Sequence, residues 1–297
     1  MNNYGILAIS MAANLSGGII KKHINDRFEN NKFAYQFYNC IVSFASAFTL
    51  LIMSESLKVS FFTVIFALAF GVVTLIQQIT NLYALEKGPF SYTSVIISLS
   101  TLIPTLSGAL FWNEKISVVQ FVGIFLLVLC FVLSVNFKNS DKKASLQWFF
   151  YCIAAFICTG LIGVMQKVHQ SSEYKIELDG FLVIAFTFSF LCSGVLSLFM
   201  MKSRTATVNS DKKSVVSVIP AILMLLSGVF VALNNKFNLF LSGVMDSAVF
   251  FPVVNGGGLV LTALSAVVIF REKLSLKRWI GIIIGILSVL LLCYPLY

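Results

Sequence analysis

The sequence predicts an all-α membrane protein with ten transmembrane helices, arranged as two inverted repeats of five helices each. Three observations support this fold class. Of the 297 residues, 58% are hydrophobic and only 11% are charged, whereas soluble proteins carry about 25% charged residues. Apolar runs of about 20 residues, each long enough to cross a bilayer, recur along the whole chain. The second half also repeats residue patterns of the first half.

Short polar connections separate the ten apolar segments. Their expected bounds are 4–21, 33–54, 60–85, 90–112, 117–136, 146–168, 179–201, 214–240, 246–270 and 275–294. The longest polar connections, such as 21–32 and 202–214, leave no room for a soluble domain. Ser117 and Gln120 form a capping box that starts the fifth helix, and Ser275 is the matching N-cap of the tenth.

The repeat divides the chain into a first unit, 1–145, and a second unit, 146–297. Leu, Gly, Lys and His of the segment 15–23 recur at the same spacing in the segment 161–169. Because five is an odd number, the two units must insert with opposite orientations, related by a pseudo-two-fold axis in the membrane plane. Duplicated membrane units are typical of secondary transporters, whose substrate site lies between the repeats.

The Lys and Arg residues are distributed unequally between the two sets of loops. One set holds sixteen of the 21, and the other holds only Lys58, Lys115, Lys167, Lys175 and Lys236. The positive-inside rule assigns the basic set to the cytoplasm, so both termini are expected outside the cell membrane. The net charge of +9 therefore reflects topology and contact with anionic lipid, and it indicates no nucleic-acid partner.

Two Glu-Lys turns resemble a known family. Residues 91–123, with Pro104 and the turn Glu114-Lys115-Ile116-Ser117, resemble the last two helices of a repeat in the drug/metabolite transporter superfamily. Residues 251–281, with the turn at Glu272, resemble the same motif in the second repeat. The branch resembled is the EamA-like one, which implies a ten-helix transporter of small organic molecules with alternating access. Many members have cytoplasmic termini, opposite to what the charge count predicts here.

Polar residues inside a membrane span are costly and are therefore candidates for function. The clearest are two amide-rich helix faces at equivalent places in the repeats: Gln77, Gln78 and Asn81, and Asn234, Asn235 and Asn238. Spacings of three and four residues put such side chains on one helix face. They are expected to line a shared cavity for a polar substrate, or to join helices through hydrogen bonds. Asn14 in the first helix is a further candidate.

The ninth helix contains Pro252, Asn255, Gly256, Gly257 and Gly258 near its middle. Proline removes a backbone donor and glycine weakens a helix, so this stretch is expected either to unwind toward a ligand and act in gating, or to allow close helix packing. Its counterpart in the fourth helix contains further candidates for binding and for a kink. These are Ser98, Thr101 and Pro104.

Glu114 and Glu272 are expected to be structural, because each lies in a turn where it can accept hydrogen bonds from backbone amides. Lys167 lies at a helix end, where its side chain is expected to extend to the membrane interface. For Lys236, extension to the interface is again one expectation. Attraction of an anionic substrate and an ion pair with Asp246 are the alternatives. The six cysteines lie in apolar segments and are read as small buried hydrophobic residues.

No carboxylate lies at mid-span, where proton relays place one, so tight proton coupling is not expected. The sequence also carries no enzyme signature and no nucleotide-binding or metal-ligand motif, and it predicts no cofactor. The expected function is transport of a small polar or amphipathic metabolite by uniport or exchange, around the first, third, fourth, sixth, eighth and ninth helices. A multidrug exporter with an aromatic cavity and a non-transporting scaffold or receptor are the alternatives. Substrate, direction and oligomeric state are left open.

Overall fold

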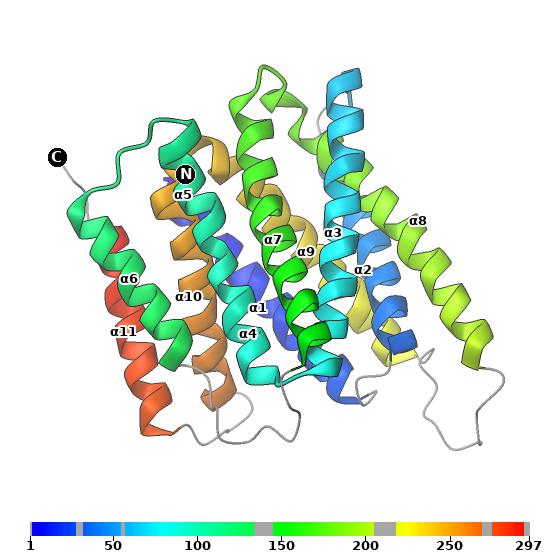
Figure 1. The fold of residues 1–297 in the computed structure, drawn as a ribbon. Coiled ribbons are helices and arrows are strands. Elements are labelled where there is room, and N and C mark those ends of the chain that lie inside the picture. Colours follow the sequence, from blue (N-terminus) through cyan, green and yellow to red (C-terminus); the bar gives the residue numbers. More distant parts are fainter. Residues whose placement is uncertain are drawn as a thin grey trace. The chain divides into compact units, whose positions relative to one another are not determined.

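The computed structural model describes residues 2–27, 32–54, 57–133, 145–204, 218–268 and 275–293. Within these ranges the chain is helical and contains no strand (Figure 1). The elements are α1 (Asn3–Arg27), α2 (Lys32–Met53), α3 (Phe61–Lys87), α4 (Phe90–Ser98), η1 (Leu99–Thr101), α5 (Leu102–Phe111), α6 (Val118–Leu133), α7 (Leu146–Ser171), η2 (Lys175–Glu177), α8 (Leu178–Arg204), α9 (Val218–Val244), α10 (Ser247–Val268) and α11 (Leu276–Leu292). Because α4, η1 and α5 form one interrupted helix, the predicted all-helical fold with ten helices is confirmed.

The helices have the length and surface of membrane spans. In the described ranges, eight segments are long and apolar enough to cross a bilayer, and α6 is a shorter apolar helix. Large apolar side chains remain exposed along them, including Phe61, Val118, Leu198 and Ile283. A soluble protein rarely exposes so much contiguous apolar surface, whereas lipid tails accept it without cost.

Helix α1 extends beyond the predicted end at residue 21 and continues to Arg27. Its last turns are held by packing, because Ile24 is buried in a cluster with Tyr38, Val42 and Met224. The polar residues that the sequence analysis placed in a loop therefore belong partly to a helix. Local polarity predicted the end of α1 too early, because the apolar residues that bury Ile24 are distant from it in the chain.

Proline interrupts one helix of the repeat and not its counterpart. Pro104 cannot donate to the carbonyl of Ser100, and the chain tightens into the 3-10 turn η1 just before it. In contrast, α10 is a continuous helix that includes Pro252. The predicted unwinding at Pro252 is therefore wrong. The alternative of close packing fits Gly256, because a β-carbon there would collide with Leu127 of α6.

The helices divide into two compact units. Unit 1 contains residues 1–75 and 172–240, and unit 2 contains residues 76–171 and 241–297. Each unit therefore combines helices from both predicted repeats. The boundaries fall inside α3 and α9, so each of these helices contributes its first part to unit 1 and its last part to unit 2. The duplication of 1–145 in 146–297 stays a prediction from the sequence.

Unit 1 is built around the pair α2 and α8, which pack along each other (Figure 1). Cys40 lies against Gly194, and one turn further along α2 the ring of Phe44 packs on Phe190 at 5.4 Å between centroids. As the residue number increases along α2, the number of the contacting residue decreases along α8, so the two helices are antiparallel. They are also the second and seventh predicted helices, which are equivalent in the repeat.

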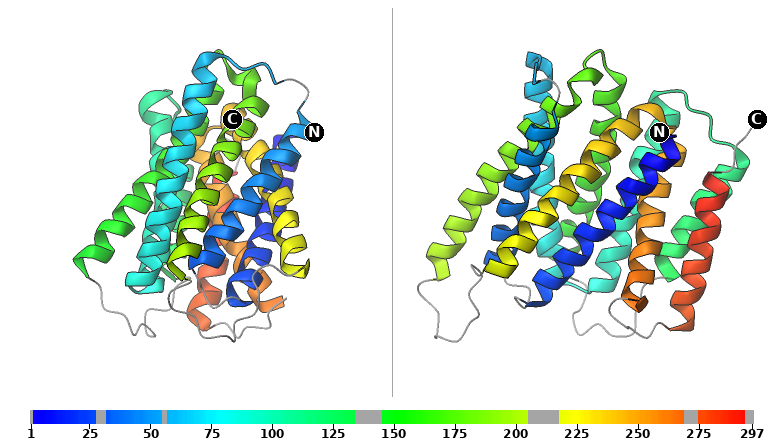
Figure 2. Two further views of the ribbon diagram at one scale, coloured as in Figure 1. Left: turned by 90° about the vertical axis from the view of Figure 1, so that its right-hand side faces the viewer. Right: turned by 180° about the vertical axis from the view of Figure 1, so that it is seen from behind.

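Unit 2 contains a corresponding antiparallel pair, α6 and α11, which lie side by side in Figures 1 and 2. The hydroxyl of Ser288 donates to the carbonyl of Gly123 at 2.7 Å. Further along α6, Cys130 lies close to Gly285. These helices are the fifth and tenth of the prediction and are also equivalent in the repeat.

Small residues also let helices pack closely within each unit. Gly163 of α7 meets Pro104 and Phe251, and a β-carbon there would lie 2.9 Å from the proline ring. At Gly228 of α9, a β-carbon would collide with Ala45 and lie 2.8 Å from the carbonyl oxygen of Val42. The carbonyl of Gly228 also accepts a hydrogen bond from Ser46 at 2.9 Å. Backbone contacts of this kind leave no flexible side chain that could move aside.

We expect Gly228→Ala to lower the free energy of unfolding by about 1–3 kcal/mol, the usual cost of overpacking a close contact. Gly18→Ala is the matched control, because no atom lies within 4 Å of a β-carbon at that position. Thermal unfolding of both purified variants in detergent measures the difference. Equal stability of the two variants would show that α2 and α9 do not pack as described.

Candidate functional site

Three polar side chains of unit 1 form a hydrogen-bonded cluster within its spans. The hydroxyl oxygen of Ser10 in α1 lies 3.0 Å from Oδ1 of Asn234 and 2.7 Å from Oδ1 of Asn238, both in α9. Nδ2 of Asn238 donates to Oδ1 of Asn234 at 3.3 Å. Ser10 is fully buried. The two asparagines are four residues apart and half-buried, so one helix face presents both amides.

Asn235 does not join this cluster. Its Nδ2 donates to the carbonyl of Val231 in its own helix at 2.9 Å. Of the three predicted amides in α9, the structure therefore brings together Asn234 and Asn238. The other candidate in unit 1, Asn14, is exposed and lies one turn after Ser10 in α1.

Unit 2 brings together two other predicted residues. Nδ2 of Asn255 in α10 donates to the hydroxyl of Thr101 in η1 at 3.0 Å and to the carbonyl of Phe251 at 2.9 Å. Thr101 is buried, and its carbonyl accepts a hydrogen bond from the hydroxyl of Thr105 at 2.7 Å. The interruption of the helix at η1 thus places a threonine hydroxyl against the amide of α10.

The predicted amides of α3 also belong to unit 2. Gln77, Gln78 and Asn81 are half-buried, and Oε1 of Gln78 is buried without a hydrogen-bond partner among the described residues. An unsatisfied amide oxygen costs free energy in an apolar environment, so it marks a place for a donor. The cavity that these amides were predicted to share with those of α9 stays a prediction, as do binding roles for Ser98 and Gly256 and gating roles for Gly257 and Gly258.

Lys167 forms a buried ion pair with Glu114, and its predicted extension to the membrane interface is wrong. The distance from Nζ to Oε1 of Glu114 is 2.7 Å, with the two side chains 8% and 10% exposed. Nζ also donates to the carbonyl of Met245 at 3.2 Å. Oε2 of Glu114 accepts from the backbone N–H of Ser247 at 2.6 Å. Glu114 thus has the structural role expected of it, because it accepts a hydrogen bond from a backbone amide. That amide belongs to Ser247, the first residue of α10, and not to the turn that contains Glu114.

A second ion pair lies in unit 1. Nζ of Lys236 in α9 lies 2.7 Å from Oδ1 of Asp179, in the first turn of α8, and donates to the carbonyl of Met53 at 3.2 Å. The predicted partner Asp246 is therefore wrong, whereas extension of Lys236 to the membrane interface stays a prediction. Sequence distance hid both ion pairs, because each acid lies 50 or more residues from its lysine.

The capping residues behave differently in the two repeats. The backbone N–H of Ser117 donates to Oε1 of Gln120 at 3.0 Å, and the N–H of Gln120 donates to the hydroxyl of Ser117 at 3.1 Å. This is a complete capping box. Ser275 occupies the N-cap position of α11 with extended backbone, but its side chain forms no capping hydrogen bond. Glu272 lies outside the described residues.

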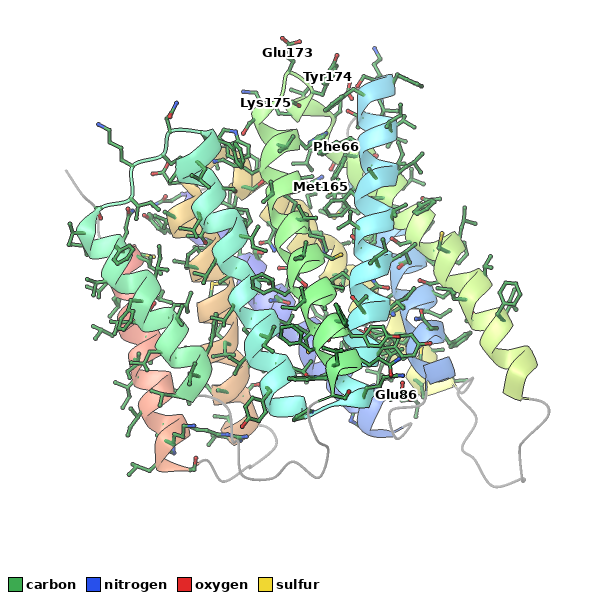
Figure 3. The ribbon with its side chains drawn as sticks, in the orientation of Figure 1. Phe66, Glu86, Met165, Glu173, Tyr174 and Lys175 are labelled. Atoms are coloured by element: carbon green, nitrogen blue, oxygen red, sulfur yellow. The ribbon has the colours of Figure 1, made fainter. Side chains whose placement is uncertain are left out.

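An aromatic pocket of about 430 Å³ opens in unit 1 at the start of α3. Its lining consists of Ser60, Phe61, Phe62, Ile65, Phe66 and Tyr174. The ring of Phe62 stacks on Phe66 at 5.4 Å and on Tyr174 at 5.0 Å between centroids. Figure 3 shows Phe66 and Tyr174 at the same end of this unit. The hydroxyl of Ser60 donates to Glu177 at 2.8 Å. The pocket offers aromatic faces and little polar surface.

Sequence reasoning missed several polar residues of the spans. Ser10 lies one turn before Asn14, and this spacing was a usable signal. Gln36 and Asn39 lie one turn apart in α2 and are buried, and each has a side-chain atom without a hydrogen-bond partner among the described residues. The hydroxyl of Ser193 in α8 is also buried without a hydrogen-bond partner among the described residues. Their polarity was visible in the sequence, but which of their side chains are buried depends on contacts with other helices.

We expect Lys167→Met to lower the free energy of unfolding by about 3–5 kcal/mol, because it leaves the buried carboxylate of Glu114 without its cation. Lys115→Met is the matched control, since Lys115 lies next to Glu114 and is exposed. The double variant Glu114→Gln, Lys167→Met should recover part of the loss. Thermal unfolding of the four proteins tests this, and equal effects of the two single lysine variants would contradict the ion pair.

The chain is similar to one known family in sequence and to solved structures in fold. Residues 5–136 match the family model of the EamA-like transporter family. No curated protein sequence matches the chain. One solved crystal structure superposes with a TM-score of 0.71 and 11% sequence identity, covering 96% of this chain and 94% of that one. At this identity the likeness concerns the fold alone.

The family match and the apolar helices agree that this is a multi-pass membrane protein. The matched segment contains α1 to α6 and both Ser10 and Thr101. The family consists of transporters and not of enzymes. Through residues 5–136, somewhat less than half of its length, the chain is similar to the EamA-like transporter family, within the drug/metabolite transporter superfamily.

Proposed function

We propose that this protein carries a small polar or amphipathic organic metabolite across the cell membrane by alternating access, as a uniporter or an exchanger. The supporting observation is the cluster of Ser10, Asn234 and Asn238 inside membrane-spanning helices. Polar side chains in a span cost free energy and are kept where they bind a substrate or line its path. Unit 2 has a polar pair of its own, Asn255 and Thr101.

The proposed mechanism uses the inverted repeat, with the helices of one repeat rocking against those of the other. The antiparallel packing of α2 on α8 and of α6 on α11 supports it, because helices that are equivalent in an inverted repeat must run in opposite directions. Termini outside the cell remain our proposal from the distribution of Lys and Arg. A small-molecule substrate and membrane lipid are the proposed partners.

Transport is proposed to proceed without tight proton coupling. Glu114 and Asp179, two acids near helix ends, are each held in an ion pair with a lysine. Neither lies at mid-span, where proton relays place a carboxylate. Uniport or exchange needs no such group.

Transport of a substrate into proteoliposomes should therefore be independent of an imposed pH gradient and should move no protons. Simultaneous recording of uptake and of lumenal pH with a trapped dye measures both. A proton flux stoichiometric with the substrate that persists in Glu86→Gln would contradict this prediction. Liposomes without protein serve as the control for passive leakage.

The second candidate function is export of many hydrophobic compounds. The observation in its favour is the aromatic pocket at the start of α3, whose stacked rings offer adaptable apolar contact. This alternative expects weak binding of unrelated compounds, unchanged by substitution of Asn234 or Asn238. A scaffold or receptor that keeps the fold is the remaining alternative, and it expects no change of accessibility with ligand.

Alternating access predicts that single cysteines at Asn14 and Ser98, in a background without the six native cysteines, change their reactivity toward an impermeant maleimide when a transported ligand is added. Each site is scored by itself, from each side of the membrane. Ile176→Cys is the control, because Ile176 is 87% exposed and lies in the turn η2, before helix α8 begins. Constant labelling at both sites with a ligand that binds would exclude a carrier and favour the scaffold.

A further inference from the structure

The Ser10 cluster has a definite hydrogen-bond polarity. An asparagine amide carries one acceptor oxygen and two N–H donors. In this cluster the oxygens of Asn234 and Asn238 both point toward the hydroxyl of Ser10, at 3.0 and 2.7 Å. The hydroxyl has one proton, which the shorter distance assigns to Oδ1 of Asn238, and Nδ2 of Asn238 donates to Oδ1 of Asn234 at 3.3 Å. The acceptor ends of the two amides are therefore occupied inside the protein.

The donor ends are left for other partners. The two amides together carry four N–H groups, and the internal hydrogen bond from Asn238 uses one of them. Within the described ranges no hydrogen bond engages Nδ2 of Asn234. Both side chains are half-buried and not sealed in the core. A helix contact formed only for stability would pair these donors across the interface.

Two other asparagines in the spans have a different hydrogen-bond polarity. Asn235 donates to the carbonyl of Val231 in its own helix. Asn255 uses both N–H groups, on Phe251 and Thr101, and retains its oxygen for a donor. Only the pair oriented by Ser10, among these four asparagines, presents nitrogens together.

We propose that Asn234 and Asn238 bind an acceptor oxygen of the substrate, such as a carboxylate, and that Ser10 is the positioning residue that holds the two amides in this orientation. This inference rests on the proposed transport function and adds to it the chemical class of the substrate. A carboxylate accepts several N–H bonds at once, whereas an ammonium group brings only donors and would face donors. The site therefore selects acids and rejects organic cations.

The test is thermal stabilisation of the purified, full-length protein by matched compounds that differ in one carboxylate. The pairs are phenylalanine and phenethylamine, leucine and isopentylamine, and histidine and histamine. At least one acid should bind, with a dissociation constant ten-fold or more below that of its amine. Acids that fail to bind, or amines that bind equally well, would overturn the proposal.

Three variants separate positioning from general stability. Ser10→Ala should weaken binding of the acid by about ten-fold, because the two amides lose the hydroxyl that orients them. Ser16→Ala is the matched control, because the hydroxyl of Ser16 in the same helix bonds only the carbonyl of Ala12. Asn234→Asp replaces an N–H donor by an acceptor at constant shape, so it should reverse the preference from acid to amine.

Binding by Ser10→Ala equal to that of Ser16→Ala, or an unchanged preference in Asn234→Asp, would exclude the assignment. If Ser10→Ala does not fold, the preference of Asn234→Asp decides alone. Failure here is distinct from failure of the proposed function. Selective binding of amines with alternating maleimide reactivity would refute only the substrate class, whereas binding of acids with constant reactivity would refute only transport.

Discussion

Hydrocarbon provides no hydrogen-bond partner, so a polar group inside the span of this protein is stabilised where it finds one within the protein. The helices satisfy their own backbone in this way. Where Pro104 removes a donor, the chain tightens into η1, and the side chains around it supply new hydrogen bonds. The same constraint applies to side chains, and it explains why a serine hydroxyl, two amides and a threonine recur as bonded groups rather than as isolated ones.

Packing is a second consequence of this solvent. Since lipid tails are as apolar as leucine, burial of apolar surface between helices provides little driving force, and close approach of backbones contributes instead. Gly228 against Ala45 and Gly163 against Pro104 are contacts of this kind. Within each unit they accompany an antiparallel pair of helices, α2 with α8 and α6 with α11.

The ion pairs show how charge is kept near the ends of the spans. Glu114 accepts both the ammonium of Lys167 and the first N–H of α10, so one carboxylate neutralises a buried cation and satisfies a helix terminus. Lys236 and Asp179 join α9 to α8 in unit 1. Such pairs hold charged groups near the helix ends, and the polar groups in the middle of the described spans are neutral side chains such as the amides of Asn234 and Asn238.

The number and order of the helices, their membrane character and the family resemblance were all determined by the sequence, because apolar length and charge distribution are local properties. The capping box at Ser117 was equally readable, since its partners lie three residues apart. The sequence did not predict where α1 ends, that α10 is continuous, or which acids pair with Lys167 and Lys236. The candidate site was predicted in part: Asn234, Asn238, Asn255 and Thr101 were named, but Ser10 was not. Only the tertiary structure decided which end of each amide is occupied, because that depends on a hydroxyl from a helix more than 200 residues away in the chain.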